Sequence, residues 1–395
     1  MTIDIIDKIK QLSQACFNEV RDIRRELHCH PELSFNEFNT AKLVAQTLDK
    51  WGIKHTDGIV KTGIVATIEG RNPEKRCIAL RADMDALPIH EENTVSYKSQ
   101  NDGIMHACGH DAHTAMLLGA AKILNTLKSD FEGTIKLIFQ PGEEVLPGGA
   151  KLMIEQGIME GVDAIIAQHC YPDLQCGEIG LCGGPYMASG NEIELTLTGK
   201  GGHAAKPQQS QDMVWIAADM VAELQKKVWK LASGKEGCVL RFGQFAANGT
   251  YNVIPDTISI KGTLRTYDEN LRNQVISLVD EHIHDKARAA NIKANLDIRQ
   301  GYPVLVNDME LKNKAKNLAS SYLGPDKVKE LQPLFTSEDF AWYSQQVPAL
   351  FYRLGTANPA KGITGKQHTS TFNIDEDALE IGMVMMVVLA LSYKP

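Results

Sequence analysis

The sequence predicts an α/β protein of two domains, in which a mixed, mostly parallel sheet is interrupted by an inserted α+β domain. Short apolar runs separated by helical segments precede Met187, and this alternation indicates buried, largely parallel strands. After Met187 the strands alternate apolar and polar residues, which is typical of antiparallel strands with one covered face. A chain of 395 residues is also too long for a typical single core.

The first part of the chain is predicted to be helical over residues 5–51, with an interruption at Pro31. Apolar strands and intervening helices follow in the order strand 63–69, strand 77–82, helix 112–128, strand 133–139, helix 149–156 and strand 163–168. The strands are short and almost wholly apolar, so both of their faces are expected to be buried beneath helices.

The middle of the chain is predicted to form one antiparallel sheet with two helices. Its strands are predicted at 191–198, 256–265 and 292–299, and its helices at 212–230 and 268–290. The second helix carries a single apolar stripe, which indicates that it packs on the sheet. We therefore expect residues 187–302 to form the inserted domain and residues 1–186 with 303–395 to form the other.

The composition excludes several classes of function. A net charge of -8 argues against a broad nucleic-acid surface and against a polybasic membrane patch. The N-terminus contains acidic residues and lacks the apolar core of a secretory signal, and the apolar stretch 378–391 contains Glu380 and is too short to span a bilayer. The eight cysteines are expected to be reduced. These features predict a cytoplasmic protein without nucleic-acid or membrane partners.

The densest group of metal-binding side chains lies in the segment His106-Ala-Cys-Gly-His-Asp-Ala-His113. Cys108 and His110 are separated by one glycine, so a tight turn can direct both at one site, and thiolate with imidazole suits zinc or another late first-row metal. A single buried cysteine or polar histidine would be better explained as an ordinary core residue. The concentration of such residues in this segment favours a metal site instead.

Two adjacent glutamates, Glu143 and Glu144, follow the predicted strand at 133–139 after the short segment Gln-Pro-Gly. The carboxyl end of a strand is where α/β sheets place their sites. Such a pair often marks only a solvated loop, but Pro141 and Gly142 constrain the chain just before it. One carboxylate could bind a metal while its neighbour takes a proton from water.

Two more histidines complete the predicted centre. His169 ends an apolar strand, and His368 lies in a polar loop before the last helix. Either residue alone would more often be an ordinary strand-end or surface histidine. Together with the preceding segments they supply more ligands than a closed four-ligand structural site needs, which predicts two metals, an open position and catalysis.

An ordered set of motifs then points to one family. The chain resembles the M20 family of metallopeptidases, and in particular its amidohydrolase branch, which includes N-acyl-L-amino-acid amidohydrolases, hippurate hydrolases and auxin-conjugate hydrolases. The resemblance runs essentially from end to end. Its motifs are RRELH at 24–28, Pro31-Glu32, Glu37, LRADMDALP at 80–88, HACGHDAH at 106–113, QPGEE at 140–144, GKGGHAAKP at 199–207, YNVIP at 251–255, GTLRT at 262–266 and SEDF at 337–340.

The resemblance implies a dinuclear metal centre and a role for each matching residue. Glu143 would be the general base, and the two divalent ions would be zinc, which Cys108 favours, or manganese, cobalt or nickel. Residues 1–186 with 303–395 would be the catalytic domain and 187–302 a lid domain through which a homodimer forms. The implied metal ligands are Cys108, His110, Glu144, His169 and His368.

The resemblance also implies roles for three residues of the inserted domain. His203 would stabilise the oxyanion, commonly in the partner subunit's active site, with Asn252 and Arg265 as candidates for binding the substrate. By itself His203 would be a surface histidine, and a turn cap is the alternative role of Asn252. The chain departs from the common family pattern at Gln208 and at Asp212-Met213, which puts lid contacts and substrate preference in doubt.

The sequence thus predicts hydrolysis of the amide bond of N-acyl-L-amino acids, such as N-acetyl or N-benzoyl amino acids, to a carboxylate and a free amino acid. A carboxypeptidase or dipeptidase acting on unmodified peptides is the alternative within enzymes. A metal- or peptide-binding protein without catalysis is the alternative outside them. A serine hydrolase is excluded because the chain has no Gly-x-Ser-x-Gly elbow.

Overall fold

The structure is a computed structural model that describes residues 3–233 and 237–393. It divides into two compact units. The first comprises the described residues up to Gly184, together with Val306–Gln332 and those from Asp339 onward. The second comprises Pro185–Leu305 and Pro333–Glu338.

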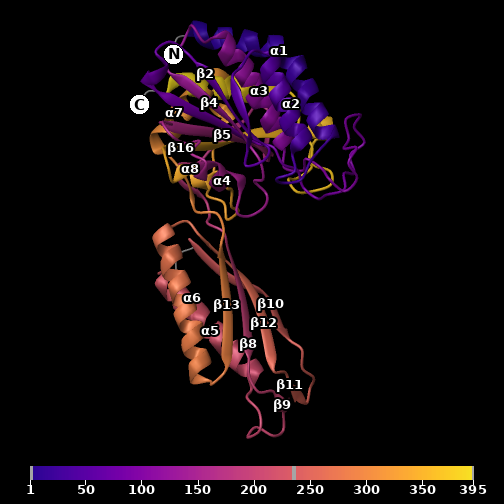
Figure 1. Cartoon of the computed structure of the whole chain (residues 1–395), viewed down its shortest axis with the longest axis vertical. Helices are drawn as coiled ribbons and strands as arrows, with labels where there is room; N and C mark the ends of the chain where they lie inside the picture. Colours follow the sequence, from indigo (N-terminus) through magenta and orange to yellow (C-terminus); the bar gives the residue numbers. More distant parts are fainter. Residues whose placement is uncertain (1–2, 234–236, 394–395) are drawn as a thin grey trace. The chain divides into compact units, whose positions relative to one another are not determined.

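The first unit is built on an eight-stranded sheet in the order β1-β2-β4-β3-β5-β16-β6-β15 (Figure 1). The pairs β3/β4, β3/β5, β5/β16 and β6/β15 are parallel, whereas β1/β2, β2/β4 and β6/β16 are antiparallel. This confirms the predicted mixed, mostly parallel sheet. The strands are β1 (His55–Ile59), β2 (Gly63–Glu69), β3 (Cys77–Asp83), β4 (Thr134–Gln140), β5 (Ala164–Gln175), β6 (Ile179–Leu181), β15 (Val328–Glu330) and β16 (Ala349–Ala357).

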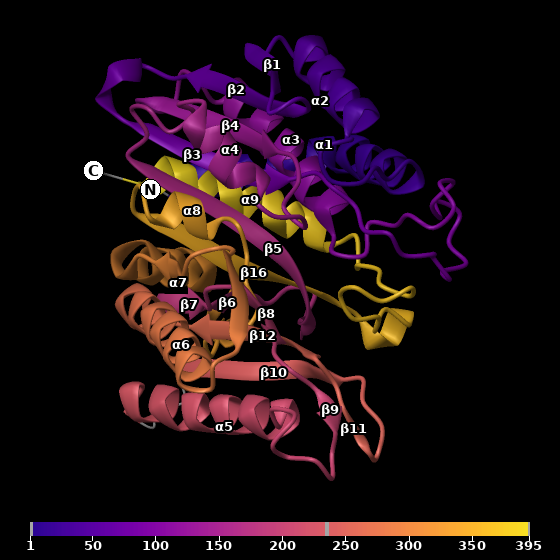
Figure 2. The ribbon, with the colours of Figure 1, turned by 60° about the horizontal axis from the view of Figure 1, so that its bottom comes forward.

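Helices pack on this sheet, and α1, α3 and α9 also pack against one another. Helix α9 is almost wholly apolar because it is buried, and Figure 2 shows it in yellow beside β5 and β16. No described helix is long and apolar enough to cross a membrane. The helices are α1 (Ile3–Cys29), α2 (Phe38–Lys50), α3 (His110–Thr126), α4 (Gly149–Glu155), α7 (Met309–Leu323), α8 (Ala341–Ser344) and α9 (Ala378–Ser392), with short 3-10 turns at Pro73–Lys75, Pro325–Lys327 and Pro359–Lys361.

The second unit is an antiparallel sheet in the order β10-β12-β8-β13, with α5 and α6 packed on one face (Figure 1). Alternate residues of β8 (Ile193, Leu195 and Leu197) are buried, as period-two alternation requires. The elements are β8 (Asn191–Thr198), β9 (Gly202–His203), α5 (Met213–Leu231), β10 (Cys238–Ala247), β11 (Val253–Ile254), β12 (Thr257–Thr266), α6 (Glu269–Ala289) and β13 (Lys293–Gln300), with short strands β7 (Gly184–Met187) and β14 (Leu305–Asn307) at the passages between the units.

The structure contains elements that were not predicted from the sequence. Among them are strands β10 and β16 and helix α7. Strand β10 is hard to recognise because its register shifts between Phe242 and Gln244, which breaks the alternation. The segment Pro333–Glu338, predicted with the first domain, belongs to the second unit. There Leu334 donates its N–H to the Tyr186 carbonyl at 2.8 Å.

Candidate metal centre

The register of three parallel strands sets the base of the candidate site. Asp83 of β3 is level with Gln140 of β4, and Arg81 is level with Ala167 of β5. Two residues farther along, Asp83 and His169 therefore come to the same level of the sheet. Glu143 and Glu144 follow β4 at this edge, so the sequence-distant acidic and imidazole groups meet because their strands run in the same direction.

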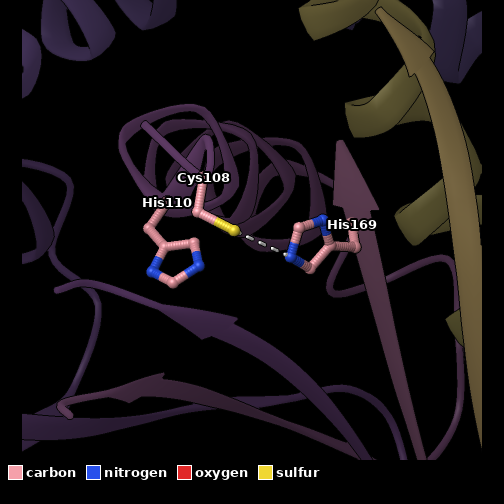
Figure 3. A group of neighbouring side chains, drawn as sticks. All are labelled: Cys108, His110 and His169. Carbon is pink, nitrogen blue, oxygen red and sulfur yellow. Dashed lines mark hydrogen bonds between the residues drawn. The ribbon is translucent and has the colours of Figure 1, made fainter. Parts of the chain in front are cut away.

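The turn before α3 brings Cys108 and His110 to the same place. Gly109 has a φ of 96°, and a Cβ there would lie 3.0 Å from the Cβ of Cys170 on β5. Glycine therefore lets the turn lie directly against this strand. Figure 3 shows Cys108 and His110 at the start of α3 and His169 on β5, with the Cys108 Sγ atom 3.5 Å from His169 Nε2.

The remaining predicted ligands lie beside this trio. His368 Nε2 is 3.2 Å from Glu144 Oε1, and His110 Nε2 is 4.0 Å from the same oxygen. Within each of three overlapping groups the candidate ligand atoms lie within 4.8 Å of one another. The groups are Cys108 with His110 and His169, Cys108 with Glu144 and His368, and His110 with Glu143 and Glu144. The structure thus brings together all five predicted ligands and the predicted base.

The free nitrogens of two histidines fit a cation at this place. His169 Nδ1 lies 2.8 Å from the Cys170 carbonyl oxygen, so it carries the proton and leaves the lone pair of Nε2 facing Cys108. His110 Nδ1 lies 3.2 Å from an Asp85 oxygen. Its Nε2 atom is buried without a hydrogen-bond partner among the described residues. A second ring nitrogen fixed by an acceptor is the usual arrangement of a metal-ligating histidine.

The electrostatics of the centre are dominated by buried carboxylates. Burial, together with the charges of Glu144 and Glu143, holds the pKa of the Cys108 thiol well above its usual value. Burial alone would lower the pKa of His110, but the Asp83 and Asp85 carboxylates outweigh it and raise this pKa to about 10. These buried carboxylates therefore favour the binding of a cation at the centre. A divalent cation beside Cys108 would in turn favour the thiolate form of this cysteine.

Asp83 and Asp85 also belong to the centre, although they were not among the site residues predicted from the sequence. Asp83 lies 2.6 Å from His113 Nδ1 and 2.5 Å from Arg81 Nη1. Although burial raises the pKa of Asp83, Arg81 and the neighbouring histidines hold it well below the usual value. Two aspartates at the end of the apolar strand 77–82 were a signal that could have found them.

The three predicted residues of the inserted domain lie in the second unit and do not form one group. His203 is on β9, which pairs with β11 directly after Asn252, and the Ala204 N–H donates to the Asn252 carbonyl at 3.0 Å. Arg265 lies near the opposite end of β12, where it donates to Ser337 Oγ at 3.2 Å. One chain therefore holds His203 and Asn252 together but keeps Arg265 apart from them.

The comparison with protein families shows which family this chain belongs to. The model of peptidase family M20/M25/M40 matches residues 79–392. The chain belongs to this family. The match starts within β3 and includes every predicted ligand of the metal centre, together with Glu143 and all three predicted residues of the second unit. The resemblance inferred from the sequence motifs is thereby confirmed.

Individual M20 relatives include both expected kinds of amide hydrolase. An N-acyl-L-amino acid amidohydrolase from Geobacillus stearothermophilus is 42% identical over 76% of this chain and 81% of its own length. A thermostable carboxypeptidase 2 from Saccharolobus solfataricus is 35% identical over 99% of this chain and 100% of its own. The crystal structure of Bacillus subtilis YxeP, described as a dinuclear metal binding peptidase of the M20 family, superposes with a TM-score of 0.81 at 33% identity, covering 96% of this chain and 98% of that one.

These findings confirm the predicted enzyme class. The chain is a metal-dependent hydrolase of the M20 family, and its fold has the two-part architecture of solved M20 structures. The two relatives are named as an N-acyl-L-amino acid amidohydrolase and as a carboxypeptidase.

Proposed function

We propose that this M20 enzyme hydrolyses the amide bond of N-acyl-L-amino acids, such as N-acetyl and N-benzoyl amino acids, and releases a carboxylate and a free amino acid. The observation that carries the proposal is the convergence of Cys108, His110 and His169 on one buried point with Glu143 and Glu144 beside it. Similarity to the N-acyl-L-amino acid amidohydrolase supports this substrate class over free peptides.

The proposed centre holds two divalent metal ions through Cys108, His110, Glu144, His169 and His368. Two of the close groups share Cys108, so one thiolate could serve both ions. Ions bound there would polarise the scissile carbonyl and lower the pKa of water. The sulfur ligand favours zinc, with manganese, cobalt and nickel as alternatives. The dinuclear metal binding M20 peptidase from Bacillus subtilis supports the number of ions.

Glu143 is proposed to move the proton. Its carboxylate is 6% exposed and adjoins Glu144, so one residue can ligate while the other accepts a proton from the attacking water. Glu143 then delivers this proton to the amide nitrogen, which leaves as the amine of the amino acid.

His203 is proposed to donate a hydrogen bond to the oxyanion. Its Nδ1 atom accepts the Ala205 N–H at 3.1 Å, so the neutral ring carries its proton on Nε2 and presents a donor there. His203 is exposed, and so is the neighbouring Asn252, which could bind the substrate beside it. One such oxyanion donor is typically worth about 3 kcal/mol.

Arg265 is proposed to bind the substrate carboxylate, in a homodimer that forms through the second unit. Arg265 and His203 flank opposite ends of β12, a strand of ten residues that is about 30 Å long. A small substrate cannot touch both residues of one chain. The proposal therefore takes Arg265 from one subunit and His203 from its partner. A cytoplasmic location is proposed as well.

A substrate screen with metal titration tests the proposal. The metal-free, reduced protein would be loaded with zinc, manganese, cobalt or nickel and assayed on N-acetyl and N-benzoyl amino acids, unblocked dipeptides and N-blocked peptides. Faster hydrolysis of the acyl amino acids supports the proposal. Preference for unblocked peptides would instead assign a carboxypeptidase or dipeptidase, and no hydrolysis of any amide would favour a binding protein.

A further inference from the structure

Gln367 joins three distant segments at the metal centre. Its side-chain Nε2 atom lies 3.7 Å from Cys108 Sγ and 3.1 Å from the carbonyl oxygen of Cys170. These partners precede it by 259 and 197 residues in the chain. Gln367 also directly precedes the proposed ligand His368. The roles proposed above do not include this partly buried amide.

The surrounding network sets the orientation of the Gln367 amide. Nε2 also lies 3.2 Å from His169 Nδ1, but that nitrogen donates its own proton to the Cys170 carbonyl at 2.8 Å. The contact between the two nitrogens is therefore not a hydrogen bond. Rotating the amide by half a turn would let its oxygen accept the His169 N–H, but it would also point that oxygen at the Cys170 carbonyl oxygen and at the Cys108 sulfur, which are both acceptors once Cys108 is a thiolate. The two N–H groups of Gln367 thus face Cys170 and Cys108.

The backbone next to Gln367 is held in a conformation that has to be stabilised from outside. His368 has a φ of 59°, in the left-handed region that a non-glycine residue seldom adopts. Its N–H donates to the carbonyl of Ala107 at 2.8 Å, and the hydroxyl of Thr369 donates to the carbonyl of Lys366 at 2.6 Å. The backbone of His368 and the side chain of Gln367 therefore hold the same turn, that of Cys108.

We propose that Gln367 is a positioning residue that donates an N–H···S hydrogen bond to Cys108 and keeps His368 aligned with Cys108. This inference rests on the proposed metal centre. A donor directed at a thiolate withdraws charge from sulfur and so weakens it as an electron donor to a metal. The same amide ties the His368 loop to β5 through Cys170, so one side chain sets both the electronic character of one ligand and the place of another.

Cobalt(II) titrated into the metal-free, reduced protein tests the hydrogen bond. Gln367→Met keeps the length of the side chain without a donor, and Gln367→Glu keeps its shape without an N–H. The thiolate-to-cobalt charge-transfer band is expected to move to longer wavelength in both variants, because the sulfur becomes easier to oxidise. Gln346→Met, at an exposed glutamine of the same unit, is the control and should leave the band in place. An unchanged band in both Gln367 variants overturns the proposal.

Metal affinity tests the alignment of His368. Competition with a chromophoric chelator should show that Gln367→Met weakens metal binding by about tenfold, the lower end of the range for residues that support metal ligands. Unchanged affinity overturns this part of the proposal. Neither measurement uses a substrate. A wild-type protein without a thiolate-to-cobalt band contradicts the metal centre itself, whereas a normal band without hydrolysis of acyl amino acids contradicts only the proposed substrate.

Discussion

The Oδ1 atom of Asp85 lies 3.2 Å from Nδ1 of His110. The other oxygen of Asp85 accepts the backbone N–H of Glu144 at 3.0 Å and the hydroxyl of Ser34 at 2.6 Å. One buried carboxylate thus connects the histidine that begins α3 to the glutamate that follows β4. Asp85 orients two proposed ligands from different segments without pointing at the metal position itself.

Replacing Asp85 by asparagine is expected to weaken metal binding by about 10- to 100-fold, the range typical of residues that orient metal ligands. The amide keeps the shape of the side chain, but it has only one acceptor oxygen for His110, Glu144 and Ser34. Chelator competition on the purified variant measures the loss. Asp102→Asn is a matched control, because Asp102 is exposed and its carboxylate pairs with the exposed His90. Equal affinities of the two variants would contradict the assigned role.

The local parts of this centre could be predicted from the sequence because they follow short-range rules. An apolar strand followed by polar residues locates the edge of the sheet, which is how Glu143 and His169 were found. Two residues in one turn, Cys108 and His110, also need no knowledge of the fold. The residue pattern already grouped the five ligands in one centre, the family resemblance assigned Glu144 as a ligand and Glu143 as the base, and the geometry brings these residues together.

The parts that could not be predicted depend on contacts between distant segments. The amide of Gln367 reaches Cys108 across 259 residues, and the left-handed conformation of His368 has no local sequence signal because residues other than glycine seldom adopt it. The wide separation of Arg265 from His203 likewise follows from the register of β12, which sequence motifs do not reveal. Such relationships are set by tertiary packing rather than by residue type.

Glu143→Gln is expected to retain its metal ions and to lose activity. Glutamine cannot take up and release the proton, and a positioned base contributes about 10²- to 10⁴-fold to the rate. Metal content by elemental analysis and kcat on the best acyl amino acid measure the two effects separately. Glu155→Gln, at an exposed position at the end of α4, should change neither. Wild-type turnover in Glu143→Gln would remove this residue from the mechanism.

Mixed dimers of two inactive variants would show whether His203 acts in the partner's site. His203→Ala and Glu143→Gln would each be inactive alone. If His203 acts across the dimer, a hybrid dimer has one complete site, and an equal mixture recovers about a quarter of wild-type activity because half of the dimers are hybrids. If His203 acts within its own chain, both sites of every hybrid lack a residue and no activity returns.

The mixing experiment needs evidence that subunits have exchanged. Differently tagged variants, unfolded and refolded together, allow the hybrid to be isolated by two affinity steps. A mixture of Glu143→Gln with Glu143→Gln carrying the second tag is the control and should stay inactive. An isolated hybrid without activity would contradict the proposed role across the dimer, and failure to recover any hybrid would contradict the proposed dimer.

Arg24→Met is expected to destabilise the first unit. Arg24 Nε lies 2.7 Å from Asp111 Oδ2, and both side chains are fully buried. Although burial raises the pKa of Asp111, Arg24 and His28 hold it well below its usual value. Removing the guanidinium leaves a buried carboxylate without its main counter-charge, and breaking such a pair costs about 3–5 kcal/mol. Urea unfolding of the wild type and the variant at pH 7 measures this difference.

The pH dependence of the difference in unfolding free energy between wild type and Arg24→Met distinguishes an effect of the ion pair from an effect of packing. A carboxyl whose pKa is lowered by folding stabilises the protein above about pH 4, and this contribution is lost as the pH falls through the folded-state pKa. The gap between wild type and Arg24→Met should therefore narrow as the pH falls through the pKa that Asp111 has in the folded variant, because the carboxyl is then neutral in the variant and still charged beside Arg24 in the wild type. Arg21→Met on the same helix, whose partner Asp22 is exposed, should cost at most about 1 kcal/mol. A gap that stays constant with pH would mean that Arg24 stabilises the unit through packing and not through the charge of Asp111.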